Sequence, residues 1–218
     1  TFARMARQNG ALIKPKSAVT KITRTQTGWR IQTASETFEA RTVVNAAGAW
    51  VDQIAEMAGI APLGFSPLRR SMARISAPAD LDVGRWPMMF GPGEDWYAKP
   101  DAGALIVSPA EEDLTTPHDA FSNDLTLAEG LARYEAHVTE PVPRLLSSWA
   151  GLRTFAPDRT LVIGPDTADP AFIWCAGQGG YGMQSSPGAS QLLADLIAGH
   201  PPSISVDAIR ALSPNRFS

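Results

Sequence analysis

The sequence of 218 residues predicts a mixed α/β (α+β) fold in which an antiparallel sheet interrupts an α/β unit. The first quarter contains the pattern of a strand, a turn of small residues and a helix. From Pro62 onward, prolines separate short strand-like runs, and after residue 148 strand and helix patterns return. We therefore expect three segments, 1–61, 62–148 and 149–218, of which the first and third share one layer.

The first segment predicts several short elements. Residues 1–10 have the pattern of a helix ended by Gly10, without an initiator methionine or a signal-peptide pattern, so we expect the chain to be cut from a longer one. Strands are expected at 18–25, 28–33 and 36–40, and a buried strand at 43–44. The chain would leave that strand through Ala46, Ala47 and Gly48 into a helix over 50–59, which ends at Gly59.

The middle segment predicts an antiparallel sheet followed by one helix. The strand-like runs are 71–76, 86–90, 95–99 and 103–108. Thr126 and Glu129 have the spacing of a capping box, which predicts that Thr126 opens the helix. The apolar stripe of this helix has helical spacing: Leu127, Leu131, Tyr134 and Val138.

The last segment predicts strands at 149–153, 160–164 and 171–177 and a closing helix over 189–199. Asp195 is expected to be solvated on a flank of that helix. Its apolar face should consist of five residues: Ala189, Leu192, Leu193, Leu196 and Ile197.

Composition excludes several classes of protein. The net charge is −3 and no basic stripe is evident, which argues against a nucleic-acid partner. No apolar run approaches the roughly 20 residues of a transmembrane helix. A single cysteine, Cys175, rules out an internal disulfide and suits a reducing, cytoplasmic location. The three histidines, His118, His137 and His200, lack metal-ligand spacing, so no metal site is expected.

A glycine-rich turn, GQGGYG at 177–182, stands between a predicted strand and the closing helix. Its glycines spell GxGxxG, the dinucleotide-binding fingerprint, but no second strand with an acidic end follows it. A complete Rossmann unit is therefore not expected. The turn still combines close backbone approach with a helix N-terminus, which favours an anionic or electron-rich ligand. A plain strand-to-helix turn that binds nothing is the alternative.

Five ordered blocks resemble those of the FAD-dependent D-amino-acid oxidase family, which includes glycine oxidase, sarcosine oxidase and the D-amino-acid dehydrogenases. They are RTVVNAAGAWVDQIA, SPLRR, WYAKPDAGALIVSPAEED, WAGLRTFAPDRTLVIGPD and FIWCAGQGGYGMQSSPG. Within the family, LRR, AGLRTFAPD and AGQGGYGMQ look most similar to the D-arginine dehydrogenase type. The resemblance implies a partial FAD-binding α/β domain interrupted by an antiparallel-sheet substrate domain, with the chain as its C-terminal portion.

The resemblance also implies how FAD would be bound. The flavin ring would lie against the glycine-rich turn: Gly179, Gly180, Tyr181, Gly182, Met183 and Gln184. The adenine end would lie near Val19 and the turn formed by Ala46, Ala47 and Gly48. No cysteine lies near Arg153, where sarcosine oxidases attach their flavin, so FAD is expected to be held noncovalently.

The substrate side of the resemblance implies an amino acid whose α-carbon gives hydride to the flavin. Arg153 would clamp the carboxylate, Tyr97 would share it, Arg70 would be a second basic residue, and the Gly180 carbonyl would accept from the amine. The three side chains have plainer interpretations. Arg153 could be a surface arginine, Tyr97 a half-buried aromatic of the sheet, and Arg70 a solvated charge beside Arg69. Dioxygen or a quinone would take the electrons. The alternative function is a non-catalytic fragment of the substrate domain that binds no flavin.

The resemblance places the nucleotide-binding motif upstream of Thr1, so we expect the printed chain to bind FAD weakly or not at all. Titrating the chain with FAD while following flavin fluorescence tests this expectation. Binding in the nanomolar range would contradict it.

Overall fold

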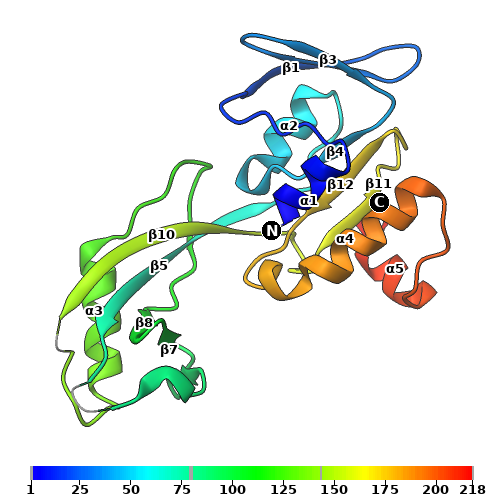
Figure 1. Cartoon of the computed structure of the whole chain (residues 1–218). Coiled ribbons are helices and arrows are strands. Elements are labelled where there is room, and N and C mark those ends of the chain that lie inside the picture. The colour runs from blue at the N-terminus through cyan, green and yellow to red at the C-terminus, as the bar shows by residue number, and fades with distance from the viewer. Residues whose placement is uncertain (1, 79–80, 143, 218) are drawn as a thin grey trace.

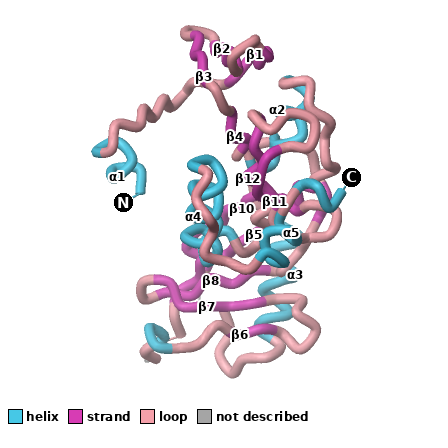
Figure 2. The backbone as a smooth tube through the Cα atoms, turned by 90° about the vertical axis from the view of Figure 1, so that its right-hand side faces the viewer, coloured by secondary structure: helices cyan, strands magenta, loops and turns pink. Residues whose placement is uncertain are grey.

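The computed structural model describes residues 2–78, 81–142 and 144–217. Figures 1 and 2 show a small sheet at one end, a six-stranded sheet at the other, and a three-stranded sheet with helices between them. The helices are α1 (Phe2–Gln8), α2 (Val51–Met57), α3 (Asp124–Glu135), α4 (Gly182–Ala198) and α5 (Val206–Leu212), with short 3-10 turns at 48–50, 83–85 and 214–217. The strands are β1 (Val19–Arg24), β2 (Trp29–Thr33), β3 (Thr37–Ala40), β4 (Val43–Asn45), β5 (Ser66–Ser76), β6 (Met89–Phe90), β7 (Tyr97–Asp101), β8 (Ala104–Ser108), β9 (Asp113–Leu114), β10 (Leu145–Phe155), β11 (Val162–Pro165) and β12 (Phe172–Ala176).

The mixed α/β class predicted from the sequence is confirmed, and the small sheet follows its predicted strands closely. Strands β1, β2 and β3 form an antiparallel meander in that order. The turn between β1 and β2 needs Gly28, because a Cβ there would lie 2.1 Å from the Ala40 carbonyl oxygen. Helix α1 ends just before Gly10, whose φ is +87°. Glycine adopts this backbone conformation without the steric cost that a side chain would add.

The three-stranded sheet has the order β11-β12-β4, with β4 parallel and β11 antiparallel to β12. The expectation that 43–44 form a buried strand is wrong in part: Val43 is half-buried and Val44 is 39% exposed. Strand β4 has only one described neighbour, β12, so one of its edges is uncovered. Asn45 is the buried residue of this strand, and its Nδ2 donates to the Val51 carbonyl at 2.8 Å.

The six-stranded sheet is built on one long antiparallel pair. Strand β5 begins at 66, earlier than predicted, and pairs with β10 from Ser66↔Phe155 to Ile75↔Leu145. On the other side of β5 the strands follow in the order β8, β7 and β6, and the short strand β9 also pairs with β5. The predicted strand at 86–90 is reduced to Met89–Phe90. The expected segment boundary after residue 148 falls inside β10, which belongs to this sheet over its whole length.

Helix α3 packs against the six-stranded sheet. The predicted capping box is wrong, because the N-cap is Asn123, whose Oδ1 accepts from the Thr126 amide at 3.0 Å. The short Asn side chain reaches this amide from an extended backbone, so the helix begins two residues before Thr126. The predicted apolar stripe is confirmed: Leu127 and Tyr134 are buried, and Leu131 and Val138 pack beside them.

Two hydrophobic clusters form the interior. One surrounds Trp29, Phe172 and Trp174 and joins the small sheet, α2 and the three-stranded sheet. The other surrounds Ile75, Leu105 and Trp96 and lies between the six-stranded sheet and α3. Strands β5 and β10 run from one region to the other (Figure 1).

Helix α4 starts at Gly182, seven residues earlier than the predicted closing helix, and includes Pro187. Proline cannot donate to the Met183 carbonyl four residues back. The Ser186 hydroxyl donates to that carbonyl at 3.3 Å, which compensates for the missing amide. The helix therefore continues through Pro187 to Gly199, where φ is +71°.

Two side-chain expectations in this region are wrong. Asp195 is not solvated: it is 9% exposed, and Gln191 Nε2 donates to its carboxylate at 2.8 Å. In the expected apolar face, only Leu192 is buried, while Ile197 is largely exposed. Cys175 lies in β12 but is half-buried, with Gln178 Nε2 3.7 Å from its sulfur, and burial raises the pKa of its thiol.

No strand follows α4 among the described residues, so the second strand of a Rossmann unit is not found there. Within residues 2–78, 81–142 and 144–217, no helix is long and apolar enough to cross a membrane. Across the same ranges, no group of three or more His, Cys, Asp or Glu side chains is placed to hold a metal ion.

We expect Asp166→Ala to lower the free energy of unfolding by about 1–3 kcal/mol. The buried Asp166 carboxylate accepts from Trp174 Nε1 at 2.9 Å and from the Ala168 amide at 2.8 Å, and its loss leaves a buried indole donor without an acceptor. Urea unfolding followed by tryptophan fluorescence measures the change. Asp207→Ala, at a side chain that is 93% exposed, is the matched control. Equal midpoints for the two variants would contradict the expectation.

Candidate functional site

A cavity of about 850 Å³ lies between the six-stranded sheet and the start of α4. The structure brings six of the predicted site residues to its wall: Arg70 from β5, Tyr97 from β7, Arg153 from β10, and Gly180, Tyr181 and Gln184 from the glycine-rich turn and α4. Strand register explains part of this grouping. Arg70 pairs with Gly151, so Arg153 lies on the same face of the sheet one diagonal step away.

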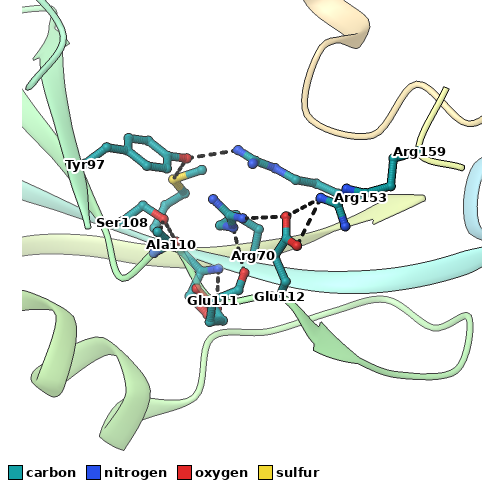
Figure 3. Close-up of polar contacts among 10 residues, drawn as sticks. Arg70, Tyr97, Ser108, Ala110, Glu111, Glu112, Arg153 and Arg159 are labelled. Atoms are coloured by element: carbon teal, nitrogen blue, oxygen red, sulfur yellow. Dashed lines mark hydrogen bonds and ion pairs between the residues drawn. The ribbon is translucent and has the colours of Figure 1, made fainter. Parts of the chain in front are cut away.

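The Arg153 guanidinium has spare hydrogen-bonding capacity. Its Nη2 donates to the Tyr97 hydroxyl at 3.0 Å, and it has no carboxylate partner among the described residues (Figure 3). The Tyr97 hydroxyl donates in turn to the Met72 sulfur at 3.4 Å, which fixes the ring under the cavity. A guanidinium with open donors in a half-buried cavity suits an incoming carboxylate.

Arg70 is buried, not solvated beside Arg69, since it is only 8% exposed. Its Nε donates to the Glu111 carbonyl at 2.7 Å and its Nη2 to the Glu112 carboxylate at 3.2 Å. Burial, followed by repulsion from Arg153, lowers the pKa of the Arg70 guanidinium. Both guanidiniums lie near the same aromatic ring, with their Cζ atoms 5.9 Å and 6.0 Å from the Tyr97 centroid.

Glu112 and Arg159 complete the polar wall, and the sequence interpretation did not include either. Figure 3 shows the Glu112 carboxylate between the guanidiniums of Arg70 and Arg159. Arg159 Nη2 donates to both carboxylate oxygens, at 2.8 Å and 3.0 Å. These bonds raise the pKa of Arg159. Its Cζ also lies 3.9 Å from the centroid of the Phe155 ring.

Three cavity residues other than glycine have left-handed backbone conformations. They are Glu94, Ala110 and Arg159, with φ of 55°, 56° and 62°. Such conformations cost about 1 kcal/mol or more for L-residues and are concentrated at functional sites. Ala110 is held by a bond from its amide to the Ser108 hydroxyl at 3.2 Å, and this turn carries Glu112 to the cavity.

The glycine-rich turn packs directly against the end of β10. The Gly179 amide donates to the Thr154 carbonyl at 2.9 Å, and a Cβ on Gly179 would lie 2.3 Å from the Phe155 ring. A Cβ on Gly180 would lie 3.0 Å from Arg153 Nη1. The glycines therefore allow the turn to approach the strand and Arg153 closely.

The other predicted cofactor residues lie elsewhere. Val19, Ala46 and Ala47 line a separate cavity of about 480 Å³ beside β4, and Gly48 starts the next turn with φ of +57°. Gly182 and Met183 form the first turn of α4, and Met183 is 94% exposed. The structure thus places the predicted residues in two regions, one at the start of α4 and one beside β4.

Residues 1–196 match the sequence profile of the FAD dependent oxidoreductase (DAO) family. This match covers most of the chain. The chain belongs to the DAO family of FAD-dependent oxidoreductases.

Individual relatives agree with this assignment. The chain is 26% identical to hydrogen cyanide synthase subunit HcnC of Pseudomonas aeruginosa over 200 residues, covering 90% of this chain and 46% of that protein. It is 27% identical to glycine oxidase of Pseudomonas putida over 179 residues, covering 80% and 46%. It therefore spans about half the length of these relatives. L-proline dehydrogenase from P. horikoshii has a similar fold, with a TM-score of 0.83 at 22% identity, covering 99% of this chain and 57% of that one.

FAD is the cofactor of the DAO family, and the residues of this chain fit a flavin. Helix α4 is 17 residues long, and its N-cap Tyr181 makes no side-chain capping bond, so the amides at its start have no side-chain acceptor. The helix dipole there favours negative charge. Replacing Gly179 or Gly180 would fill space next to Phe155 or Arg153, which shows that the turn requires glycine and its bare backbone.

We expect Gly179→Ala to lower both the melting temperature and the flavin content of the protein. The new Cβ would overlap the Phe155 ring, and the left-handed φ of 51° is unfavourable for alanine. Gly188→Ala in α4 is the matched control, since its Cβ meets nothing within 4 Å, and a helical alanine should raise stability slightly. Thermal unfolding and flavin absorbance of both variants, made in the full-length protein, give the comparison; equal flavin content would contradict the role of the turn.

Proposed function

We propose that this DAO-family protein oxidises an amino acid, a D-amino acid or an N-substituted glycine, at the bond between its α-carbon and its nitrogen. The α-carbon loses a hydride and the amine a proton, giving an imino acid. Water then hydrolyses this product to an oxo acid and ammonia. Where the nitrogen is substituted, the products are the oxo acid and an amine. When bound, FAD supplies the hydride acceptor.

One observation carries the proposal: Arg153 has open donors in a cavity that also contains the glycine-rich turn. Its Nη1 lies 3.0 Å from the position of a Gly180 Cβ. A carboxylate bound to this guanidinium would therefore bring the adjoining α-carbon close to the turn. The relationship to glycine oxidase of Pseudomonas putida supports an amino-acid substrate.

The other cavity residues have distinct roles in this proposal. The Tyr97 hydroxyl, oriented by Arg153 and Met72, shares the substrate carboxylate. Arg70 contributes positive charge from the floor of the cavity while Glu112 fixes its guanidinium. The Gly180 carbonyl accepts a hydrogen bond from the substrate amine. No side chain acts as a nucleophile.

The turn and the cavity beside β4 provide the cofactor contacts in this proposal. Gly179 to Gln184 line the flavin ring, and the first amides of α4 stabilise negative charge on it. Val19 and residues 46–48 contact the adenine end. The half-buried Cys175 lies in β12, away from the Arg153 wall of the cavity, which supports noncovalent binding.

The wider organisation follows from the same proposal. Residues 62–148 form the main part of a substrate domain, and 1–61 and 149–218 contribute to the FAD domain. Dioxygen or a quinone accepts the electrons, and the family branch resembling D-arginine dehydrogenase favours a quinone. The single cysteine supports a cytoplasmic location.

Arg153→Ala should raise KM for the amino acid by about one to two orders of magnitude while the flavin stays bound. A lost charge-assisted hydrogen bond costs about 1.5–3 kcal/mol. Steady-state kinetics of the flavin-loaded full-length protein measure this change. Arg210→Ala removes an exposed arginine on α5 and serves as the control. A KM within two-fold of the parent value for Arg153→Ala would refute the carboxylate clamp.

A panel of D-amino acids, L-amino acids and N-methylglycine tests the substrate class in the flavin-loaded full-length protein. Reduction of an artificial dye and formation of peroxide are measured in parallel for each compound. We expect dye reduction with at least one D-amino acid or N-substituted glycine and little peroxide. If none of the compounds reduces the dye, the proposed reaction is refuted. Peroxide formed in stoichiometric amount would mean that dioxygen, and not a quinone, accepts the electrons.

A further inference from the structure

The cavity carries more positive charge than one substrate carboxylate can balance. Four cationic side chains line it, Arg70, Lys99, Arg153 and Arg159, against two carboxylates, Glu94 and Glu112. Among the lining side chains the excess is therefore two positive charges; the Glu111 carboxylate, which does not line the cavity, also attracts Arg70. An amino acid with a neutral amine and one carboxylate supplies one negative charge, which leaves one positive charge unbalanced.

The three arginines share a single described carboxylate at the cavity wall. Glu112 is bonded by both Arg70 and Arg159, and Arg153 has no acidic partner among residues 2–78, 81–142 and 144–217. Burial and the charge of Arg153 already disfavour the charged form of Arg70. A second anionic group in the cavity would relieve this repulsion.

Arg159 is the side chain best placed to bind that group. It donates to Glu112 only through Nη2, and its Nε and Nη1 have no carboxylate partner in the described part of the chain. Its position also uses a left-handed backbone, φ 62°, which glycine would adopt more easily. Stacking on Phe155 and bonding to Glu112 hold its guanidinium at the cavity wall despite this cost.

The cations lie along one wall of the cavity, an arrangement that suits one ligand with two acidic groups. Arg153 and Arg70 both lie about 6 Å from the centre of the Tyr97 ring, at 6.0 Å and 5.9 Å. Arg70 in turn shares the Glu112 carboxylate with Arg159. Arg153 and Arg159 therefore flank Arg70 in the same cavity, where one dicarboxylic acid can bind to both.

We infer that the substrate is an amino acid with a second carboxylate and that Arg159 selects it. This inference rests on the proposed function, because Arg153 and Tyr97 bind the carboxylate next to the α-carbon. The charge excess opposes a cationic side chain such as that of arginine, although the family branch resembling D-arginine dehydrogenase would favour one.

Binding of unreactive acids tests the inference without turnover. The flavin-loaded full-length protein is titrated with succinate and butyrate, and with glutarate and pentanoate, while the flavin absorption spectrum and the heat of binding are recorded. We expect each dicarboxylate to bind at least about ten-fold more tightly than its monocarboxylate partner. Arg159→Gly should remove this preference and change butyrate affinity by less than about three-fold. Glycine fits the left-handed backbone at this position.

Lys99→Gln is the matched control. It removes one positive charge from the same cavity, and the side chain of Lys99, unlike its strand-paired backbone, has no hydrogen bond or ion pair to a described residue. We expect this variant to keep most of the preference for dicarboxylates. Should Arg159→Gly fail to fold, Arg159→Asn carries the same test, because asparagine also tolerates the left-handed conformation.

Two results would overturn the inference: equal affinity of the parent protein for both members of a pair, or loss of the preference in Lys99→Gln as large as in Arg159→Gly. The proposed function has a separate failure. If Arg153→Ala leaves butyrate affinity unchanged, the carboxylate clamp itself is wrong. If Arg153→Ala lowers the affinity for butyrate while the parent protein binds dicarboxylates no more tightly than monocarboxylates, only the role of Arg159 is wrong.

Discussion

The antiparallel pairing of β5 with β10 is the constraint on which the rest of the structure depends. This pair runs between the two hydrophobic clusters and brings Arg70 and Arg153 onto one face of the sheet. A shift of β10 by one residue in this register would put the Arg153 side chain on the opposite face of the sheet from Arg70. The end of β10 also supplies Phe155 and Thr154, against which the glycine-rich turn packs. One strand pair therefore sets the position of both the cationic wall and the turn.

Much of the local structure could be predicted because periodicity and turn residues mark it directly. The meander at 19–40, the helix ended before Gly59 and the apolar stripe of α3 follow from such patterns. The failures involve contacts between distant residues. Asp195 looks solvated from helical spacing alone, yet it is buried and accepts from Gln191. The start of α4 was missed because Pro187 normally opposes a helix, and the compensating bond from Ser186 is visible only in three dimensions.

The candidate site divides in the same way. Arg70, Tyr97 and Arg153 were identified through five ordered sequence blocks, and the structure brings them to one cavity. Glu112 and Arg159 were missed, since they are 47 residues apart and meet only through the fold. A signal for Arg159 exists in the sequence: a long side chain stands in a Pro-Asp turn, where glycine is the more usual residue. Glu112 had a weaker signal, a carboxylate shortly after the buried strand β8.

The charge of the cavity has a consequence for the rate of encounter with ligands. The chain as a whole has a net charge of −3, whereas the cavity wall has an excess of two positive charges. A cationic cavity in a chain of slightly negative net charge attracts anions toward itself, an arrangement that accelerates their diffusional association. Dissolved ions shield such attraction beyond about 8 Å at physiological ionic strength. The arginine cluster therefore makes ligand capture dependent on salt, through the association rate more than through the contacts made once the ligand is bound.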